Sequence, residues 1–292
     1  MIANVILTHN CNLCCKHCYL SEKLSVKDDV NISTSWGKIL EIAPRLNIDK
    51  FNFTGGEVTT SHYVGNVVDS CRQNNYAISI FTNGINIPKR IIKECNEYWI
   101  SLDGTESVHN EIRNNSCAFK NTMQSLEILK NLKKIIHIQT TVNKKNIECL
   151  DELIPIYESL LPQLSSISLT CVIDQGNAKQ NRLSLNQEEL RQVKLFKEQL
   201  VERLSYKVLV KDNLYTKEQI RQFVLNSHAI FPLWIDLIDH IAYVFSDNFC
   251  CELETMNEKW FGETQNVIKT ILYRKIEQQD EKDLINIENL LV

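Results

Sequence analysis

Short runs rich in Val, Ile, Phe and Thr alternate with longer amphipathic runs of helical period along the first two thirds of the chain. Strands are expected at residues 4–7, 50–53, 77–81, 99–102, 136–142 and 166–172. Helices are expected near residues 36–45, 63–74, 88–95, 119–132, 147–161 and 188–204, the last with Asn186 and Glu189 as a capping box. This alternation predicts an α/β fold in which helices cover a parallel sheet.

The pattern changes beyond residue 205 to a short strand, a helix near 216–224, a hairpin within 233–245 and a helix after Phe261. We therefore expect two regions, 1–205 and 206–292, the second being a small α+β extension that packs on the first. Five glycines directly follow expected strands: Gly55, Gly56, Gly84, Gly104 and Gly176. Each alone is most simply a loop glycine, but the carboxyl ends of parallel strands share one edge, so together they predict a site there.

Composition narrows the class of protein. The 292 residues carry a net charge of −4 with both signs mixed along the chain, which argues against nucleic acid as a partner. No segment is long and apolar enough to span a bilayer, and the N-terminus lacks the features of a signal peptide, so we expect a cytoplasmic protein without membrane contacts. Eleven cysteines in such a chain indicate metal or redox chemistry rather than disulfides.

A cluster of cysteines follows the first expected strand, with Cys11, Cys15 and Cys18 at C-x3-C-x2-C spacing. Three thiolates can hold three corners of a [4Fe–4S] cubane and leave the fourth iron open to another molecule. Cys14 is a competing thiol, whose side chain should point away from a cluster that Cys15 binds. The alternative is a Cys3His zinc site completed by His9 or His17.

Six further motifs follow the cysteines in order: FTGGEV (53–58), FTNG (81–84), SLDG (101–104), HNEIRN (109–114), TTVNKKN (140–146) and QGNA (175–178). With CNLCCKHCYL they resemble the radical S-adenosylmethionine (radical SAM) superfamily over about residues 4–178. SLDG with HNEIRN resembles its SPASM/twitch branch, whose members often modify ribosomally made peptides. The resemblance implies a partial (β/α)6 TIM-like barrel, with a [4Fe–4S] cluster and S-adenosyl-L-methionine as cofactors.

The resemblance also implies a role for each matched residue. Cys11, Cys15 and Cys18 would bind the cluster. Gly55, Gly56 and Glu57 would meet the methionyl amine of the cofactor, and Arg113 its carboxylate. Ser101, Asp103 and Asn143 would reach the ribose or the methionyl group, Asn83 of FTNG would also contact the cofactor, and His17 and Val172 would border the adenine. Taken alone, Asp103 and Arg113 would more often form a surface ion pair.

The implied reaction is reductive cleavage of S-adenosylmethionine to a 5′-deoxyadenosyl radical, which abstracts hydrogen from a substrate. A flavodoxin-type or ferredoxin-type protein would donate the electron. The favoured substrate is a ribosomally made peptide, modified by a crosslink, epimerisation or oxidation. Since one expected strand precedes Cys11, the peptide would need a separate leader-binding protein or the C-terminal region. The alternatives are radical dehydrogenation or rearrangement of a small molecule such as a sugar or amino acid, and a metal-binding interaction module without enzymatic activity.

The C-terminal region departs from the SPASM/twitch pattern. Asn226-Ser227-His228 stands where the leading cysteine is expected, Asp239-His240 replaces the turn glycine of the hairpin, and no cysteine follows Cys251. We therefore expect a degenerate region without an auxiliary cluster. The alternative is a second cluster held by Cys171, Cys250 and Cys251 with His228.

Overall fold

The computed structural model describes residues 1–24, 32–204, 208–226, 230–244, 247–281 and 283–291. Two compact units make up the chain. The first unit contains Met1–Asn10, Ser25–Ile78 and Tyr215–Val292, and the second contains Cys11–Leu24 and Ser79–Leu214. His228 and Ser227 of the degenerate region lie outside the described residues.

The sheet of the first unit has the strand order β11-β10-β9-β1-β2. These strands are β1 (Ile2–Thr8), β2 (Lys50–Gly55), β9 (Leu233–Asp236), β10 (Ile241–Val244) and β11 (Cys250–Glu252). β1 is parallel to both β2 and β9, whereas β10 is antiparallel to β9 and β11. The C-terminal hairpin thus extends the sheet beside β1. The helices of the first unit are α1 (Ile32–Ile42), α2 (Val64–Gln73), α9 (Lys217–Leu225), α10 (Glu258–Ile276) and α11 (Ile287–Leu291). The short strand β12 (Ile285–Asn286) also belongs to this unit.

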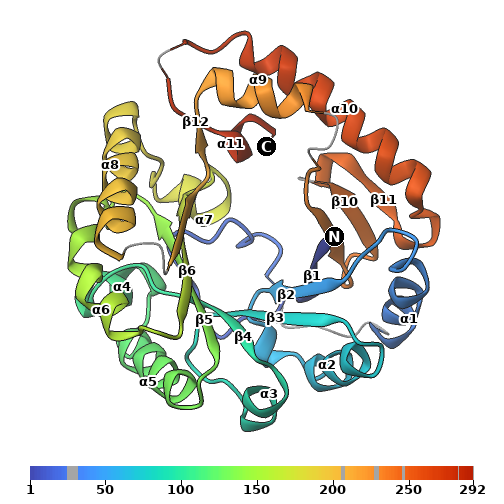
Figure 1. The fold of residues 1–292 in the computed structure, drawn as a ribbon, viewed down its shortest axis with the longest axis horizontal. Coiled ribbons are helices and arrows are strands. Elements are labelled where there is room, and N and C mark those ends of the chain that lie inside the picture. Colours follow the sequence, from blue (N-terminus) through green and yellow to red (C-terminus); the bar gives the residue numbers. More distant parts are fainter. Residues whose placement is uncertain (25–31, 205–207, 227–229, 245–246, 282, 292) are drawn as a thin grey trace. The chain divides into compact units, whose positions relative to one another are not determined.

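The second unit has a parallel sheet in the order β3-β4-β5-β6-β7. Its strands are β3 (Ala77–Thr82), β4 (Glu97–Ser101), β5 (Ile135–Val142), β6 (Leu164–Cys171) and β7 (Leu209–Asp212), and β8 (Leu214–Tyr215) lies at the boundary between the units. Its helices are α3 (Lys89–Glu94), α4 (Glu106–Arg113), α5 (Ala118–Asn131), α6 (Ile154–Ser159), α7 (Gly176–Gln180) and α8 (Gln187–Leu204). Figure 1 shows α3, α5, α6 and α8 along one side of these strands. Tyr98 fastens the two layers, because its buried hydroxyl donates to the Ile91 carbonyl of α3 at 2.8 Å.

The six expected strands and the hairpin are confirmed, with ends that differ by at most two residues. The capping box is also confirmed, since Asn186 N–H donates to Glu189 Oε2 at 2.6 Å and Glu189 N–H donates to Asn186 Oδ1 at 3.0 Å. The continuous helix expected over 147–161 is wrong. The structure has a 3-10 segment, Ile147–Leu153, followed by α6, because Cys149 is non-helical (φ −127°) and Pro at the start of α6 has no N–H to donate. The helices α4 and α7 were not expected.

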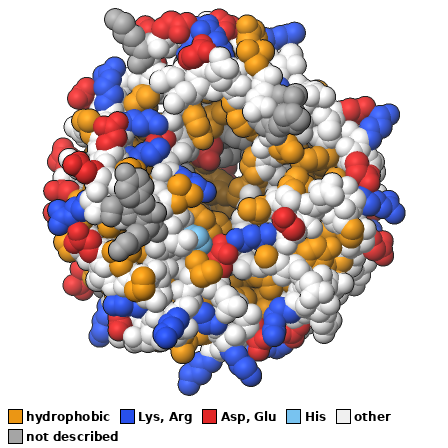
Figure 2. All heavy atoms as spheres, viewed as in Figure 1, with side chains coloured by type: hydrophobic (Ala, Val, Ile, Leu, Met, Phe, Trp, Pro, Cys, Tyr) orange, Lys and Arg blue, Asp and Glu red, His pale blue; other side chains and the backbone are white. Residues whose placement is uncertain are grey.

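No described helix is long and apolar enough to cross a membrane. Figure 2 shows acidic and basic side chains interspersed on the face it presents.

Candidate active site

The cysteine loop directly follows Thr8, His9 and Asn10 at the end of β1. Cys15 is buried, Cys11 and Cys18 are half-buried, and Cys14 is exposed. Cys14 therefore differs from its neighbour Cys15 in solvent exposure. The three thiols that are partly or fully buried are those of Cys11, Cys15 and Cys18, at C-x3-C-x2-C spacing. Burial raises the pKa of the Cys15 thiol, and burial followed by the Cys15 charge raises the pKa of Cys18 to about 11. These thiols need positive charge nearby to ionise at neutral pH.

Two segments from elsewhere in the second unit hold the cysteine loop in place. At the end of α4, the Ile112 carbonyl accepts the Lys16 N–H at 2.8 Å. In α7, the Asn177 N–H donates to the Cys18 carbonyl at 3.0 Å, and its side-chain amide donates to the Cys15 carbonyl at 3.0 Å. Asn181 adds a hydrogen bond to the Lys16 carbonyl at 3.0 Å. The QGNA and HNEIRN motifs thus form the frame around the cysteines.

Gly176 allows this close packing. Its φ is +54°, and a Cβ there would lie 2.7 Å from the Cys18 carbonyl oxygen, the Tyr19 carbonyl oxygen and the Ser21 hydroxyl. Any L-amino acid side chain would collide with the backbone of the cysteine loop and adopt an unfavourable conformation. The glycine that the sequence places after a strand is therefore required by contact with the cysteine loop.

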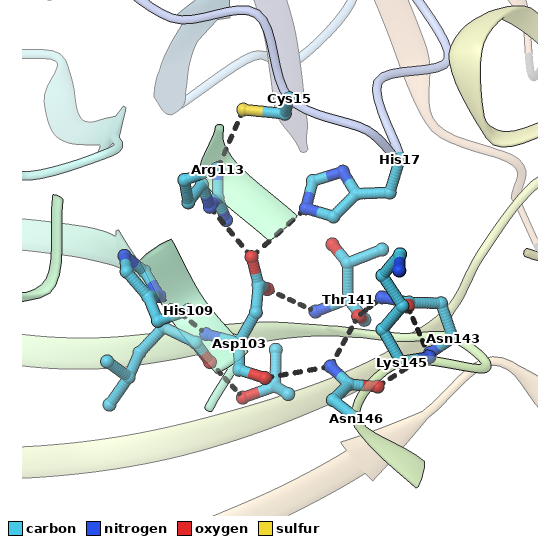
Figure 3. Close-up of polar contacts among 11 residues, drawn as sticks. Cys15, His17, Asp103, His109, Arg113, Thr141, Asn143, Lys145 and Asn146 are labelled. Carbon is cyan, nitrogen blue, oxygen red and sulfur yellow. Dashed lines mark hydrogen bonds and ion pairs between the residues drawn. The ribbon is translucent and has the colours of Figure 1, made fainter. Parts of the chain in front are cut away.

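A buried charged network lies behind Cys15 (Figure 3). Asp103 is completely buried, and Arg113, His17 and His109 are each at least nine-tenths buried. Arg113 Nε lies 2.7 Å from Asp103 Oδ2 as an ion pair without hydrogen-bond alignment, and Arg113 Nη1 donates to Cys15 Sγ at 3.8 Å. His17 Nε2 lies 3.0 Å from the same carboxylate oxygen, and the Thr141 N–H donates to the other at 3.0 Å. Taken alone, Asp103 and Arg113 were expected to form an ion pair at the surface. They do form an ion pair, but it is buried.

The charges of this network fix its protonation. Burial alone would raise the pKa of Asp103, but Arg113 and His17 outweigh burial and hold that pKa well below its usual range. Burial would likewise lower the pKa of Arg113, but Asp103 outweighs it and raises that pKa. Burial, followed by the charge of Arg113, lowers the pKa of His109 to about 4. His109 is therefore neutral at pH 7, and its Nδ1 accepts the Asp103 N–H at 3.1 Å.

Asn146 joins the loops after β4 and β5. Its side-chain amide donates to the Asp103 carbonyl at 2.8 Å and to the Thr141 carbonyl at 3.0 Å, and its Oδ1 accepts the Asn143 N–H at 2.8 Å. Asn143 is fully buried, and its Oδ1 accepts the Lys145 N–H at 3.0 Å. The sequence did not single out Asn146, His109 or Asn177. All three lie within the quoted motifs, which are the one indication of their importance.

The remaining residues of the second unit that were expected to bind cofactor occupy the carboxyl ends of its strands. Ser101 ends β4 and is half-buried. Asn83, after β3, donates from its side chain to Asn12 Oδ1 at 2.7 Å, which connects FTNG to the cysteine loop. Val172, after β6, packs in a small apolar cluster with Ala178 and Leu183.

The Gly55-Gly56-Glu57 loop belongs to the first unit. Gly55 has a φ of +145°, and a Cβ there would lie 2.3 Å from the Thr8 carbonyl oxygen. The same carbonyl accepts the Gly56 N–H at 2.8 Å, and the Asn10 carbonyl accepts the Glu57 N–H at 2.8 Å. The buried Glu57 carboxylate accepts the Thr59 N–H at 3.1 Å. The glycines thus bring this loop against the end of β1.

The donor set fits an iron–sulfur cluster better than a single zinc ion. Thiolates on one zinc, at about 2.3 Å, lie within roughly 4 Å of one another. Across the described residues, His9, Asp236 and Asp239 are the one group of three ligand atoms that lie within 4.8 Å of one another, and it contains no cysteine. The histidines of the zinc alternative each have a carboxylate partner on one ring nitrogen: His9 Nε2 lies 2.9 Å from Asp236 Oδ2, and His17 Nε2 lies 3.0 Å from Asp103 Oδ2. Such a partner is compatible with a metal on the other ring nitrogen, so the zinc alternative is disfavoured by the spacing of the ligand atoms and not by these contacts.

The C-terminal hairpin turns without glycine. His240 takes up the left-handed conformation with a φ of +56°, and its Nδ1 lies 2.9 Å from Ser35 Oγ. On β11, Cys250 is exposed and Cys251 is half-buried, while Cys171 at the end of β6 is buried. Successive residues of a strand point to opposite faces, so Cys250 and Cys251 do not face the same way.

Comparisons with known proteins agree with these motifs. The Bacillus subtilis antilisterial bacteriocin subtilosin biosynthesis protein AlbA is 26% identical over 147 residues, covering 48% of this chain and 33% of that protein. The Methanosarcina barkeri Fe-coproporphyrin III synthase is 25% identical over 158 residues, covering 52% of this chain and 39% of that protein. The matches thus span well under two thirds of these relatives.

The fold matches that of Streptococcus suis SuiB bound to S-adenosylmethionine. The TM-score is 0.73 at 13% identity, covering 92% of this chain and 68% of that chain. SuiB is also known bound to its precursor peptide SuiA. At this identity the likeness shows the fold alone, and the expected α/β fold of the partial-barrel type is confirmed.

The model of the radical SAM superfamily matches residues 5–154, which is half of the chain. The chain therefore belongs to the radical SAM superfamily, and it is an enzyme whose cofactors are a [4Fe–4S] cluster and S-adenosylmethionine.

Proposed function

We propose that this radical SAM enzyme modifies a ribosomally made peptide, and that Cys11, Cys15 and Cys18 bind its catalytic cluster. The observation that carries the ligand assignment is the anchored cysteine loop, in which Cys15 is buried beside Arg113 while Cys14 is exposed to solvent. The Arg113 guanidinium, 3.8 Å from Cys15 Sγ, offsets the desolvation cost of a thiolate at this buried position. The thiolate form is the one that binds a metal.

The cofactor-binding role of the motif residues is part of the proposal. We assign Gly55, Gly56 and Glu57 to the methionyl amine, Arg113 to the carboxylate, Ser101, Asp103 and Asn143 to the ribose or methionyl group, and His17 and Val172 to the adenine, with Asn83 beside them. The support is their placement on the motifs and, in the second unit, at the carboxyl ends of neighbouring parallel strands.

When bound, the cluster and S-adenosylmethionine supply one-electron cleavage of a sulfonium and hydrogen abstraction from an unactivated carbon. The chain contributes orientation and fixed charge. Asp103 holds both Arg113 and His17 on one carboxylate oxygen, and neutral His109 and Asn146 fix the backbone of Asp103. Because these groups are buried and paired, their positions and charges are set by the fold, which would preorganise the site.

The peptide substrate is supported by two similar proteins, the bacteriocin biosynthesis protein AlbA and SuiB, whose fold matches and which is known bound to a precursor peptide. The competing candidate is a small molecule, and the Fe-coproporphyrin III synthase supports it. We further propose a flavodoxin-type or ferredoxin-type donor, a separate leader-binding protein, and the division of the chain into a catalytic region, 1–205, and a degenerate C-terminal region, 206–292.

The test is anaerobic reconstitution of the full chain, followed by incubation with S-adenosylmethionine, dithionite and a short precursor peptide encoded beside its gene. We expect 5′-deoxyadenosine and a peptide that either loses two hydrogens or takes up solvent deuterium at one α-carbon. If 5′-deoxyadenosine forms but the peptide stays unchanged, and coproporphyrin is altered instead, the small-molecule function holds.

A further inference from the structure

One imidazole and two carboxylates converge in the first unit, where β1 and β9 end. His9 directly follows β1, Asp236 is the last residue of β9, and Asp239 lies in the turn between β9 and β10. One possible ligand atom from each of the three side chains lies within 4.8 Å of the other two. We name these three residues the His9 cluster.

The sheet brings His9 and Asp236 together. β1 and β9 are parallel, with Ile6 opposite Asp236, and the Leu237 N–H donates to the Ile6 carbonyl at 3.1 Å. Because parallel strands end at the same edge of a sheet, the residue that follows β1 meets the last residue of β9. His9 Nε2 consequently lies 2.9 Å from Asp236 Oδ2.

The turn after β9 fixes the direction of the Asp236 carboxylate. Asp236 Oδ1 accepts the Ile238 N–H at 2.9 Å and the Asp239 N–H at 3.1 Å. These bonds engage one carboxylate oxygen, while the other is directed at His9. The same bonds hold the backbone of Asp239 beside Asp236. The ligand atoms are therefore positioned by the backbone of the hairpin, as a metal site requires.

The charge of the His9 cluster favours a cation. Asp236 is fully buried and His9 is 5% exposed, whereas Asp239 is exposed to solvent. Across the residues that the structure describes, Asp236 forms an ion pair with His9 and none with a lysine or arginine. A buried carboxylate is costly unless a cation or a metal compensates it, and a second carboxylate within 4.8 Å adds repulsion. A divalent ion would remove both costs.

The spacing fits neighbouring ligands of one ion. Ligand atoms at about 2.1 Å from an octahedral ion are about 3.0 Å apart when adjacent. The 2.9 Å between His9 Nε2 and Asp236 Oδ2 matches such a pair. Carboxylates suit Mn²⁺ and imidazole suits Fe²⁺, whereas thiolates select zinc and iron–sulfur clusters. A donor set of one imidazole and two carboxylates therefore indicates an ion of the Mn²⁺ or Fe²⁺ class.

We propose that His9, Asp236 and Asp239 bind one divalent metal ion of this class, through His9 Nε2, Asp236 Oδ2 and a carboxylate oxygen of Asp239. In the bound form His9 carries its proton on Nδ1, so that the lone pair of Nε2 is donated to the ion. Three protein ligands on an octahedral ion leave three positions for water or for an oxygen of another molecule. The site uses no cysteine, so the inference does not rest on the proposed function.

The test measures Mn²⁺ binding to the full chain, because thiolates have little preference for this ion. The chain is reconstituted anaerobically, freed of loosely bound iron on a chelating resin and titrated with Mn²⁺, and electron paramagnetic resonance measures the free ion. We expect one Mn²⁺ per chain. Asp236→Asn and Asp239→Asn should each raise Kd by about tenfold or more. The control Asp151→Asn makes the same change at an exposed position of the second unit and should leave Kd unchanged.

A second set of measurements separates this site from the cysteines and from folding defects. Changing Cys11, Cys15 and Cys18 together to Ala should preserve Mn²⁺ binding, and Mn²⁺ should raise the Tm of the unaltered chain and of Asp151→Asn but not of Asp239→Asn. Since Asp239 is exposed, Asp239→Asn should keep its circular dichroism spectrum. No binding by the unaltered chain up to about 1 mM Mn²⁺, or equal Kd in the unaltered and Asp239→Asn chains, would overturn the proposal. Loss of binding in the cysteine variant, with an unchanged spectrum, would assign the ion to the cysteine loop and overturn it as well.

Discussion

Arg113 Nε lies 2.7 Å from Asp103 Oδ2 in an ion pair whose two side chains are almost entirely removed from solvent. The pair connects the end of β4 to the end of α4, and through Arg113 it reaches Cys15. A buried ion pair contributes little net stability compared with apolar packing, but loss of one partner leaves an uncompensated charge.

Asp103→Asn should therefore destabilise the chain strongly. We expect a loss of about 3–5 kcal/mol in the free energy of unfolding, because Arg113 would stay buried without its counter-charge. Urea denaturation followed by circular dichroism measures it. Glu111→Gln is the matched control, since the exposed contacts of Glu111 with Lys16 and Lys145 should be worth at most about 1 kcal/mol. A loss for Asp103→Asn no larger than that of the control would contradict the role of the buried pair.

His109 should make the fold sensitive to mild acid. Its folded pKa is about 4, lower than in an unfolded chain, where it is about 6.5, so the unfolded state binds more protons between these values. Stability is then complete above about pH 6.5 and falls by up to roughly 3 kcal/mol as the pH drops towards 4. His109→Asn keeps an acceptor for the Asp103 N–H but cannot titrate, so its stability should fall less over this range. If the free energy of unfolding fell equally with pH in the unaltered chain and in His109→Asn, His109 would not be the group responsible for the acid sensitivity.

Each of Cys11→Ala, Cys15→Ala and Cys18→Ala should abolish the cluster and all 5′-deoxyadenosine formation, because a cubane with one open iron needs three protein ligands. Cys14→Ala should leave both largely intact, since its side chain is exposed. Iron content and product yield after anaerobic reconstitution give the readout. If the Cys14 variant no longer cleaved S-adenosylmethionine while one of the other three variants still did, Cys14 would be a cluster ligand in place of that cysteine.

Gly176→Ala should displace the cysteine loop without touching a cysteine. Its φ of +54° alone costs an alanine about 1–2 kcal/mol, and the added Cβ would meet two carbonyl oxygens of the loop at 2.7 Å. We expect lower iron retention and a lower unfolding midpoint. Gly262→Ala in α10 is the control, because nothing lies within 4 Å of its Cβ position and the change should stabilise the helix by roughly 0.5–1 kcal/mol. Normal iron retention in Gly176→Ala would show that the loop does not depend on this contact.

Iron content also tests the degenerate C-terminal region. With Cys250 and Cys251 on opposite faces of a strand, we expect the reconstituted chain to hold about four irons rather than eight. Changing Cys171, Cys250 and Cys251 together to Ala should leave that content unchanged, with at most a modest loss of stability from packing at buried Cys171. Reproducible iron near eight that falls by half in the triple variant would reveal an auxiliary cluster.

Local patterns in the sequence determined the elements and the candidate chemistry. Alternating runs of apolar residues fixed the positions of β1 to β6, and the capping box at Asn186 formed because its partners are three residues apart. The spacing of Cys11, Cys15 and Cys18 indicated a cluster because all three expected ligands lie close together in the sequence, within one loop. The helix α4 escaped detection because its eight residues are too few to establish a period between Gly104 and the left-handed Asn114.

Only the tertiary structure decided which of these residues meet. Asn177 supports Cys15 across 162 positions, and Asn146 holds the Asp103 carbonyl across 43. The burial of the Asp103–Arg113 pair, which sets its charge state and that of His109, likewise depends on layers of sheet and helix that no single segment contains. Hydrogen bonds and desolvation act through space, so residue spacing could predict the loop that binds the cluster but not the network that holds the loop in place.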